Sequence, residues 1–324
     1  MIIYLLKQSF LLIIALFLLT LVSFSLNYFT VEGQLSSLPL RQAYIFYLTC
    51  LLHWNFGFSR INGQPISDQL SVVVPATMEL CFLAFILALL ISIPIGIIAG
   101  VWRNKPIDYI IKMFTLIGFS IPLFVLALLF ILLFSFKLEW LPASGRMNLL
   151  YDLKPVTGFY LIDVWLSNSI YQNQMFINLI EHLILPIITL AVAPISEMIG
   201  LIKNSTESVM GENYIKAASL RGLSRITIIK RHVLHNALPP IIPKLGLQFS
   251  TMITLTMFTE LVFNWPGLGS WLVMAIRYHD YSSIAAGVMI IGILIVFVNV
   301  ITDIVGTMMN PSKYKDGKYG YIFR

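Results

Sequence analysis

The sequence predicts an all-α integral membrane protein with six transmembrane helices and both termini in the cytoplasm. Of the 324 residues, 58% are hydrophobic and only 11% are charged, whereas soluble domains carry about 25% charged residues. Six apolar stretches are long enough to cross the ~30 Å hydrocarbon core as helices. Lys and Arg gather in alternate connections between these stretches, and this asymmetry sets the orientation.

The first apolar stretch begins just after Lys7. It is longer than the ~7–15 apolar residues of a signal peptide, and no small-residue cleavage site follows it, so we expect it to stay as a span. Prolines at four later positions are expected to kink their helices, because proline removes a backbone hydrogen bond; these are Pro94, Pro122, Pro186 and Pro194. The six predicted spans are Ser9–Phe29, Thr77–Gly100, Tyr109–Phe134, Ile180–Ile202, Leu245–Phe263 and Ile284–Met309.

Two connections on one side of the membrane are long, Thr30–Ala76 and Ser135–Leu179. Neither carries enough apolar pattern of its own to predict an independent domain. Inside the first, Ala43–Trp54 is apolar but too short to span. We expect this stretch to lie along the membrane surface or to pack on the helix bundle.

The distribution of Lys and Arg orients the chain. Fifteen of the 21 lie before the first span, in two connections on the same side, or after the last span, and only six lie in the longer connections on the other side. Because Lys and Arg collect on the cytoplasmic side, both termini and the segment 203–244 are predicted to be cytoplasmic. The same asymmetry explains the net charge of +6 without a nucleic-acid partner.

The segment 213–240 is strongly basic, although it only connects two spans. It carries five Lys or Arg and two His. Asn213 is expected to be the N-cap of a short helix, and Gly222 is expected to follow the end of that helix. Ser224 is expected to cap a second helix, which the Pro-Pro pair beginning at Pro239 would end.

Helical spacing predicts which residues of these two helices share a face. In the first helix, one face carries residues three, four and seven apart, namely Tyr214, Ala217, Ala218 and Arg221. The two alanines would let another backbone approach closely. Anionic lipid could anchor such a basic helix pair, or the alanine face could dock on a cytoplasmic protein, and the pattern alone leaves both open. In the second helix, Ile226, Ile229, Val233 and Ala237 oppose Thr227, Arg231, His232 and His235, with Ile228 as an apolar exception on the polar side.

The same segment resembles the EAA-type loop of bacterial ABC importer permeases, in the dipeptide/oligopeptide branch of that family. Lys216 stands where the family's Glu-Ala-Ala motif has Glu. The matching loop positions are Glu212, Tyr214, Ala217, Ala218, Gly222, Leu223, Arg231, His232, Asn236, Ala237, Leu238 and Pro239. Six further blocks match in order, so the resemblance covers most of the chain: Pro75–Leu80, Ile93–Gly100, Gly118–Phe124, Trp140–Arg146, Phe263–Ile276 and Asn299–Ile304.

The resemblance implies a type I ABC importer permease fold in three parts: the first span with a periplasmic segment (1–72), a permease domain (73–309) that contains the coupling loop 203–244, and a cytoplasmic tail (310–324). It also implies a heterodimer with a second homologous permease, two cytoplasmic ATPase subunits and a periplasmic substrate-binding protein. The loop would couple the ATPases to the spans through Glu212, Tyr214, Ala217, Ala218, Arg221, Gly222, Leu223, Arg231, His232 and Asn236.

In function, the resemblance implies a transport subunit of the bacterial inner membrane rather than an enzyme. Similar systems have been linked to peptides, including antimicrobial peptides, to polyamines such as putrescine and to potassium, so the substrate and the direction of transport stay open. No G-x-x-x-x-G-K-[ST] motif occurs in the sequence, so this chain has no P-loop for ATP phosphates. We expect ATP and Mg²⁺ on the ATPase subunits and no cofactor on this chain.

Four acids lie in or beside the predicted spans, where an ionisable residue is by default a functional candidate. A cationic peptide or polyamine would favour acids along its path. All four lie near span ends, however, where they can reach water or a basic neighbour. We expect structural pairing for Glu79 and Asp303, and the roles of Glu197 and Glu260 stay open.

The fifth predicted span carries polar residues on one face. Small polar residues commonly mediate helix packing in membranes, but the architecture of the resembled family favours pore lining for Gln248, Thr251, Thr254 and Thr259. The turn after this span would lie at the outer membrane edge, with Trp265 and Trp271 as interfacial anchors. Its candidate residues for a periplasmic gate are Trp265, Pro266, Gly267 and Gly269.

Other functional classes fit the sequence less well. His232 and His235 have no Asp, Glu or Cys at a spacing that would complete a metal site, and Cys50 and Cys81 show neither a metal nor a disulfide pattern. The intramembrane-protease motifs G-x-S-x-G and H-E-x-x-H are absent. An ion-coupled secondary transporter and a non-transporting membrane anchor remain as alternatives, although no internal repeat of the kind usual in such transporters is seen.

Overall fold

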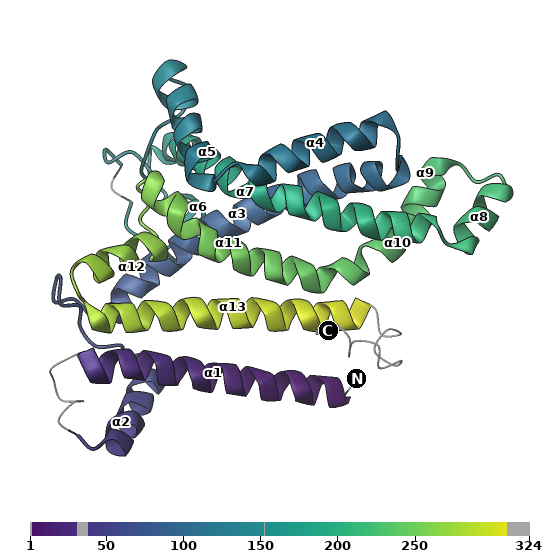
Figure 1. Cartoon of the computed structure of the whole chain (residues 1–324). Coiled ribbons are helices and arrows are strands. Elements are labelled where there is room, and N and C mark those ends of the chain that lie inside the picture. The colour runs from purple at the N-terminus through teal and green to yellow at the C-terminus, as the bar shows by residue number, and fades with distance from the viewer. Residues whose placement is uncertain (1, 31–37, 152, 310–324) are drawn as a thin grey trace.

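A computed structural model describes residues 2–30, 38–151 and 153–309, and these form helices joined by turns (Figure 1). Five helices are long and apolar enough to cross a membrane, and a sixth span is possible if the bent pair α4–α5 is counted as one. The long helices are α1 (Ile2–Thr30), α3 (Ile66–Val101), α7 (Gln172–Met210), α11 (Ile242–Val262) and α13 (Tyr281–Met309). The shorter elements are α2 (Leu40–Leu52), α4 (Pro106–Ser120), α5 (Leu123–Phe130), η1 (Ile131–Lys137), α6 (Tyr160–Leu166), α8 (Asn213–Leu220), α9 (Arg225–Ile228), η2 (Ile229–Val233), α10 (Leu234–Ala237), η3 (Pro239–Ile241) and α12 (Leu268–Arg277).

Each predicted span coincides with helical structure, but the helices extend beyond the apolar windows. Helix α3 begins at Ile66, eleven residues before the predicted start, and α7 contains 39 residues. Only one of the four prolines expected to kink a span interrupts its helix. Helices α3 and α7 continue through Pro94, Pro186 and Pro194, whereas Pro122 separates α4 from α5 and the following η1, which meet at 96°.

The centre of the bundle is the pair α3 and α7, which pack along each other. Two glycines one helical turn apart on α3 allow this close approach. A Cβ atom on Gly96 would lie 2.7 Å from the Cβ of Ile202, and one on Gly100 would lie 2.5 Å from the Cβ of Thr206. Small residues at this spacing are the common device for close helix packing in membranes. Any larger side chain there would force the two helices apart.

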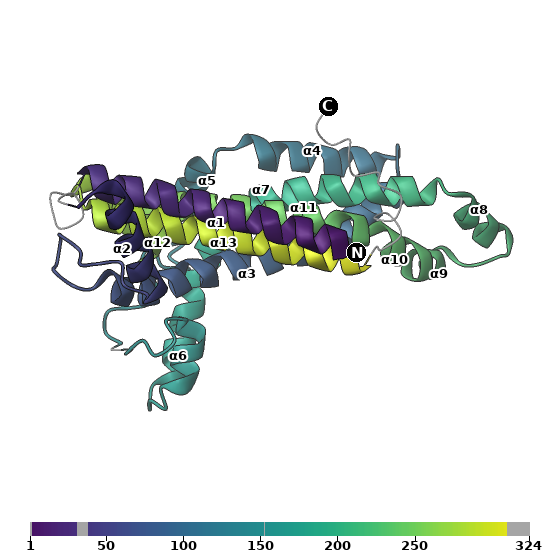
Figure 2. The ribbon, with the colours of Figure 1, turned by 90° about the horizontal axis from the view of Figure 1, so that it is seen from below.

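Small residues also join the other long helices. On α11, Gly246 leaves room for Thr302 of α13, and in return Gly306 of α13 leaves room for Pro243. Helix α1 lies along α13 in both ribbon views (Figures 1 and 2). The hydroxyl of Ser23 on α1 donates a hydrogen bond of 2.8 Å to the carbonyl oxygen of Ala285.

The short apolar stretch near residue 43 forms α2, and of its two predicted placements the structure shows packing on a bundle helix. The Tyr47 hydroxyl lies 2.6 Å from the Ser23 hydroxyl, and the Tyr44 hydroxyl lies 2.9 Å from that of Thr20. Phe24 fills the space between these tyrosines, and all three rings make aromatic contacts. Helix α2 is therefore attached to the C-terminal half of α1.

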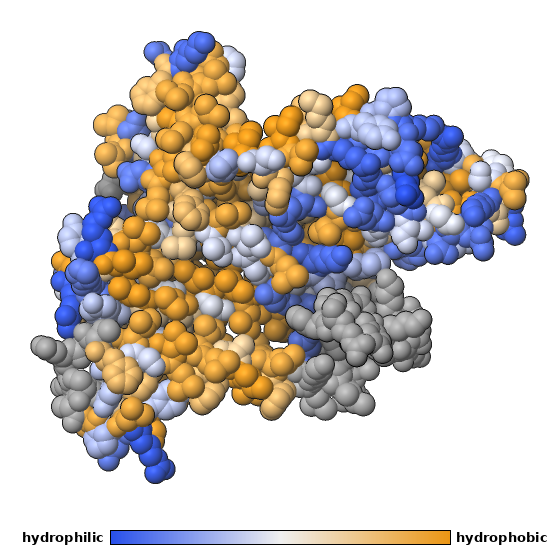
Figure 3. Space-filling model, viewed as in Figure 1, coloured by the Kyte–Doolittle hydropathy of each residue, from blue (hydrophilic) through white to orange (hydrophobic). Residues whose placement is uncertain are grey.

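The molecule has two polar ends and an apolar middle. Helices α8 to α10 lie at one end, which we call the arm end, together with the start of α1 and the last turns of α13, whereas α2 and α12 lie at the opposite, distal end (Figures 1 and 2). Apolar residues cover much of the helices between the two ends, and hydrophilic residues gather near the ends (Figure 3). Helix α3 passes without interruption through the boundary expected at 72/73; the expected tail 310–324 lies outside the described residues.

Candidate coupling arm and distal cavity

The basic segment forms an arm, defined here as Asn213–Ala237, which extends past the end of α7 (Figure 2). It turns at Gly222, whose φ of +80° is readily adopted by glycine alone. Ser224 then caps α9, because its hydroxyl accepts a hydrogen bond of 3.2 Å from the amide of Thr227. Both of these predicted roles are confirmed. Asn213, by contrast, is not the N-cap of α8, since Glu212 holds that position and makes no side-chain capping bond.

The inner side of the arm is a small apolar cluster. Ile215 and Ala218 of α8 pack with Val209 at the end of α7 and with residues of the second half, Ile228, Val233 and Ala237. A hydrogen bond of 2.7 Å from the Ser205 hydroxyl to the carbonyl oxygen of Ala237 ties the returning chain to α7. The arm is thus folded upon itself and joined to the longest helix of the bundle.

The predicted faces of the second arm helix are wrong in one respect. Ile228 was expected on the polar side, but it is buried, and Ile226 is 66% exposed. The reason is a turn of π-helix, η2, which places one more residue in the turn than an α-helix does. This extra residue brings Ile228 onto the same face as Val233, five positions later. The α-helix ends at Ala237, just before the Pro-Pro pair, as expected, and the 3-10 turn η3 then carries the chain into α11.

The outer side of the arm exposes apolar residues among basic ones. Leu220 is 90% exposed and Ile226 is exposed as well. The two alanines that were expected to form one docking face point in different directions. Ala217 is exposed, whereas Ala218 packs in the arm's own apolar cluster. Tyr214 lies on the exposed side, with its ring 6.1 Å from that of His232. The other candidate coupling residues on the exposed surface are Glu212, Arg221, Gly222, Leu223, Arg231 and Asn236.

A polar cavity of about 470 Å³ lies between the arm and the neighbouring ends of α7 and α11. The candidate coupling residues Glu212, Tyr214 and Asn236 line it together with Lys244 of α11. The structure therefore brings these residues, distant in the sequence, around one space. Partial desolvation of the Tyr214 phenol, together with the nearby negative charge of Glu212, raises its pKa above the usual value.

An ionic cluster that the sequence analysis missed stands beside the arm. Lys203 near the end of α7 forms a buried ion pair with Asp108 of α4. Asp108 also accepts a hydrogen bond of 3.0 Å from the amide of Asn104, and Lys112 lies 3.3 Å away. Glu207 extends the cluster, 3.5 Å from Lys203. The only sequence signal was a lysine and an aspartate at the ends of two separate spans, which gave no indication that they meet.

The polar stripe expected on the fifth predicted span is divided in the structure. Gln248 donates a hydrogen bond to Glu197 of α7, while Thr251 and Thr254 are exposed on the surface of α11. Thr259 is buried instead, and its hydroxyl has no hydrogen-bond partner among the described residues. Gln248, Thr251 and Thr254 can therefore face a partner or a pathway, whereas Thr259 faces the interior of the bundle.

The turn after α11 is packed tightly against the helix bundle. Trp265 is fully buried, and its indole nitrogen donates a hydrogen bond of 3.1 Å to the carbonyl oxygen of Ala76, so the expectation of an interfacial anchor is wrong. A Cβ atom on Gly267 would lie 2.2 Å from a carboxylate oxygen of Glu260. The indole nitrogen of Trp271 donates a hydrogen bond of 2.8 Å to Gln69. Of the other two gate candidates, Gly269 packs on Met257 and Pro266 lines the distal cavity.

All four acids noted in the sequence take part in hydrogen bonds. Glu260 is fully buried and accepts hydrogen bonds from the Thr77 hydroxyl and, at 2.8 Å, from the amide of Ser270. Asp303 accepts one of 2.9 Å from Gln8. Glu197 pairs with Gln248 and Glu79 with Arg146. As expected, Glu79 and Asp303 each have a structural partner. Glu197 and Glu260 have structural partners as well.

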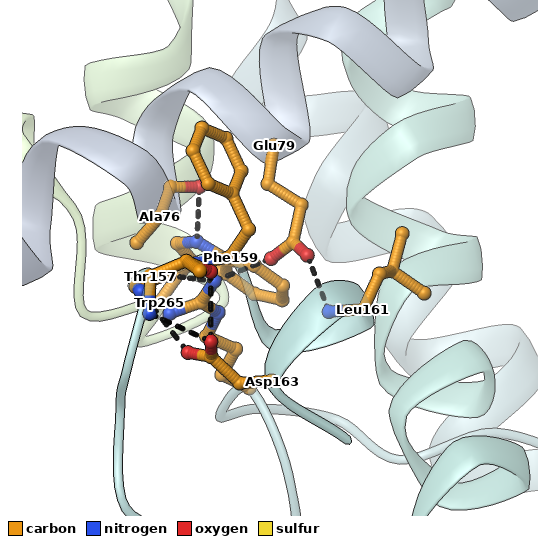
Figure 4. A network of polar contacts seen from close by, with 9 residues as sticks. Ala76, Glu79, Thr157, Phe159, Leu161, Asp163 and Trp265 are labelled. Atoms are coloured by element: carbon orange, nitrogen blue, oxygen red, sulfur yellow. Dashed lines mark hydrogen bonds and ion pairs between the residues drawn. The ribbon is translucent and has the colours of Figure 1, made fainter. Parts of the chain in front are cut away.

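The pair Glu79–Arg146 belongs to a buried network at the distal end (Figure 4). Glu79 on α3 also accepts a hydrogen bond of 2.9 Å from the amide of Leu161. The Arg146 guanidinium donates a hydrogen bond of 2.8 Å to the carbonyl oxygen of Gly158 and lies 3.6 Å from the centre of the Tyr160 ring. This network fixes the long connection between η1 and α7 onto the bundle.

Beside this network lies a cavity of about 1250 Å³, here called the distal cavity. Its walls come from the segment before α3 and the first turns of α3, from the connection after η1 with the start of α6, from α7, and from the end of α11 with the following turn and α12. Its lining includes the charged and aromatic side chains of Arg146, Tyr160, His182, Glu260, Trp271 and Arg277. No group of three or more potential metal ligands occurs among the described residues.

Comparison with known proteins identifies the family. Residues 92–314 match the model of the family described as "Binding-protein-dependent transport system inner membrane component". The chain belongs to this family of transport permeases. The expected family and the all-helical type I permease fold are therefore confirmed.

Several characterised permeases are similar to this one over nearly its full length. It is 58% identical to the putrescine export system permease protein SapB of Escherichia coli (strain K12), over 98% of both chains. It is 57% identical, over the same share of both chains, to the peptide transport system permease protein SapB of Salmonella typhimurium. The di/tripeptide transport system permease protein DppB of Pseudomonas aeruginosa is 36% identical, over 84% of this chain and 80% of that protein.

One solved structure confirms the fold of the permease. An inward-facing structure of the MetNI methionine ABC transporter aligns with a TM-score of 0.56 and 15% identity, over 75% of this chain and 96% of the other. Likeness at this identity carries the fold alone.

Proposed function

We propose that this permease is an inner-membrane subunit of an ATP-driven ABC transporter, paired with a second homologous permease and with two cytoplasmic ATPase subunits. The observation that carries the proposal is the arm: a compact helical projection, folded on its own apolar cluster, that presents exposed Leu220 and Ile226 among basic residues. Exposed apolar side chains ringed by polar ones mark protein interaction sites. The ATPase subunits are the partners that would cover them.

Energy for transport would come from the partners. The sequence has no P-loop, so ATP and Mg²⁺ would bind the ATPase subunits and this permease would bind no cofactor. Closure of the ATPases would displace the arm, and the Ser205–Ala237 hydrogen bond would pass that displacement to α7. Rigid-body movement of helices between two packed arrangements is the general form of such a change.

Peptides and polyamines are the two substrate classes that the relatives suggest, since their names include peptide transport and putrescine export. A periplasmic substrate-binding protein would deliver or accept substrate at the distal end. The structural partners of all four acids weigh against an ion-coupled secondary transporter, because such a transporter needs a carboxylate that is free to exchange its ion. A membrane anchor would not need an arm with an apolar outer side.

The arm can be tested with one matched pair of substitutions. Leu220→Asp places a charge on the exposed apolar side of the arm, whereas Leu149→Asp makes the same change at a fully exposed leucine of the distal end. We expect Leu220→Asp to reduce co-purification of the ATPase subunits at least tenfold and to abolish ATP-dependent transport in proteoliposomes. Leu149→Asp should leave ATPase binding unchanged. Equal ATPase binding by both variants and the unaltered protein would refute the docking role.

A further inference from the structure

The distal cavity contains a cation that the protein leaves partly unpaired. Arg146 is buried, and its guanidinium is held by Glu79, by the carbonyl oxygen of Gly158 and by the Tyr160 ring. Its Nε–H, however, has no hydrogen-bond partner among the described residues. An unpaired buried donor on a charged group is costly, so an acceptor group brought close to this guanidinium would be stabilised.

A second guanidinium lies at the same cavity. Arg277 is the last residue of α12, is exposed, and makes no ion pair within the described ranges. Arginine stays charged in proteins, and its planar fork of N–H groups matches the two oxygens of a carboxylate. The apolar Trp271 and Met274 line the cavity next to it on the same helix. Arg277 can therefore bind a carboxylate while its neighbours contact an apolar side chain.

No carboxylate among the described lining residues is free to pair with Arg277, whereas Arg146 is already paired with Glu79. Glu260 is the one acid among the lining residues that the structure describes. It is fully buried, and its two oxygens accept hydrogen bonds from Thr77 and from the amide of Ser270. His182 contributes a ring whose Nδ1–H donates to the carbonyl oxygen of Asn178, at 2.7 Å. A diamine entering the cavity would find no free carboxylate among the described lining residues, whereas the guanidinium of Arg277 is open to an anion.

From this charge pattern we propose that the distal cavity binds the carboxyl-terminal end of a peptide, with Arg277 as the carboxylate ligand. Trp271 and Met274 contact the last side chain, and Arg146 supports the negative charge from the floor of the cavity. The inference rests on the proposed transport function and chooses between its two substrate classes. It assigns this permease a site that favours peptides over polyamines.

Binding of defined probes to the assembled transporter in lipid nanodiscs tests the site. Calorimetry would compare trileucine, trileucine amide, which lacks the terminal carboxylate, and putrescine. Because a hydrogen-bonded ion pair contributes about tenfold or more to affinity, we expect trileucine to bind at least tenfold more tightly than its amide. Arg277→Gln should remove that difference, and Arg277→Lys should keep part of it. Arg60→Gln is the control, since Arg60 is exposed at the same end but does not line the cavity.

Three results would each overturn the proposal: no detectable binding of trileucine, equal affinity for trileucine and its amide, or an affinity for trileucine that Arg277→Gln does not change. The transport function is tested separately, by ATPase docking at Leu220. Putrescine transport by an intact, ATP-hydrolysing complex that does not bind trileucine would refute the cavity assignment alone. Equal ATPase binding by Leu220→Asp and the unaltered protein would refute the docking role of the arm and leave the cavity measurement valid.

Discussion

Lys203 and Asp108 face each other at the arm end of the bundle with almost no exposure to solvent. Removing one partner of a buried ion pair leaves an uncompensated charge, which costs about 3–5 kcal/mol. An exposed ion pair contributes roughly 0–1 kcal/mol. Arg103, whose side chain is 62% exposed and pairs with Glu207 at 3.4 Å, is such an exposed member of the same cluster.

We therefore expect Lys203→Met to lower the thermal unfolding temperature in detergent clearly, and Arg103→Met to change it little. Circular dichroism of the helices measures both. The double variant Lys203→Met/Asp108→Asn should recover part of the loss, because it removes the charge left behind. Equal effects of Lys203→Met and Arg103→Met would contradict the burial of the Lys203–Asp108 pair.

Gly267 supports a second prediction at single-residue scale. An added methyl group would overlap the carboxylate of Glu260, which itself holds the start of α12 through the Ser270 amide. Overpacking of this kind costs about 1–3 kcal/mol. Gly267→Ala should thus destabilise the protein, whereas Gly200→Ala, in the middle of α7 with nothing within 4 Å, should be neutral or slightly stabilising. Melting temperatures of the two variants in the same detergent provide the comparison.

Residue roles at these sites were only partly predictable from the sequence. Glu79 was expected to have a structural partner, and it has one, because acids near span ends rarely stay unpaired. Arg146 was recognised only as part of a family-like block, since nothing in a loop sequence shows that an arginine will be buried 67 residues from its partner. Trp265 was misassigned, because a tryptophan beside an apolar run has the same local pattern at an interface and in a core.

Among the elements, the second half of the arm shows how one turn alters a whole face. The π turn η2 makes Ile228 part of the arm's apolar cluster and leaves Ile226 exposed. Periodicity alone predicted the opposite, because it assumes 3.6 residues in every turn. A π turn leaves no reliable mark in a single sequence, so this error could not have been avoided.

The arm offers a test in which the structure and a regular α-helical pattern predict opposite results for Ile226 and Ile228. Ile228→Ala should destabilise the arm by about 2 kcal/mol or more, as expected for truncation of a buried isoleucine, and Ile226→Ala should have little effect. Hydrogen exchange of the amides in residues 213–237 would rise in the first variant and stay unchanged in the second. A larger increase for Ile226→Ala would mean that the arm is a regular α-helix.

The apolar windows predicted where the helices lie but not where they begin and end. Helix α7 was expected over Ile180–Ile202 and runs from Gln172 to Met210, because amphipathic turns continue a helix beyond its apolar part. Proline marked a helix end at only one of the four positions. Neighbouring helices support the chain around Pro94, Pro186 and Pro194, as is usual in membrane proteins, and only Pro122 coincides with a break.

For the whole molecule, the class of protein, the number of apolar stretches and the family could be predicted from composition and ordered motifs. The sides of the membrane were inferred from Lys and Arg, and the structure places the start of α1, the last turns of α13 and the arm at one end (Figure 1). The two cavities could not be predicted, since each is assembled from segments far apart in the chain.

Orientation can be checked with two exposed leucines, Leu149 at the distal end and Leu220 on the arm. In a background with Cys50 and Cys81 replaced by serine, Leu149→Cys should react with a membrane-impermeant maleimide in spheroplasts. Leu220→Cys should react only in inverted vesicles, because the arm is expected in the cytoplasm. Labelling of both cysteines from the same side would contradict the topology.

Helix α7 is uninterrupted over 39 residues, about 58 Å at 1.5 Å per residue. It carries Ser205, which holds the arm, and His182, which lines the distal cavity. The helix is continuous between these two residues, through Pro186 and Pro194, so we expect a tilt of α7 at one end to reorient the wall of the distal cavity at the other. Ligand binding in the distal cavity and movement of the arm should then be coupled. A spectroscopic probe attached to either one would report on both.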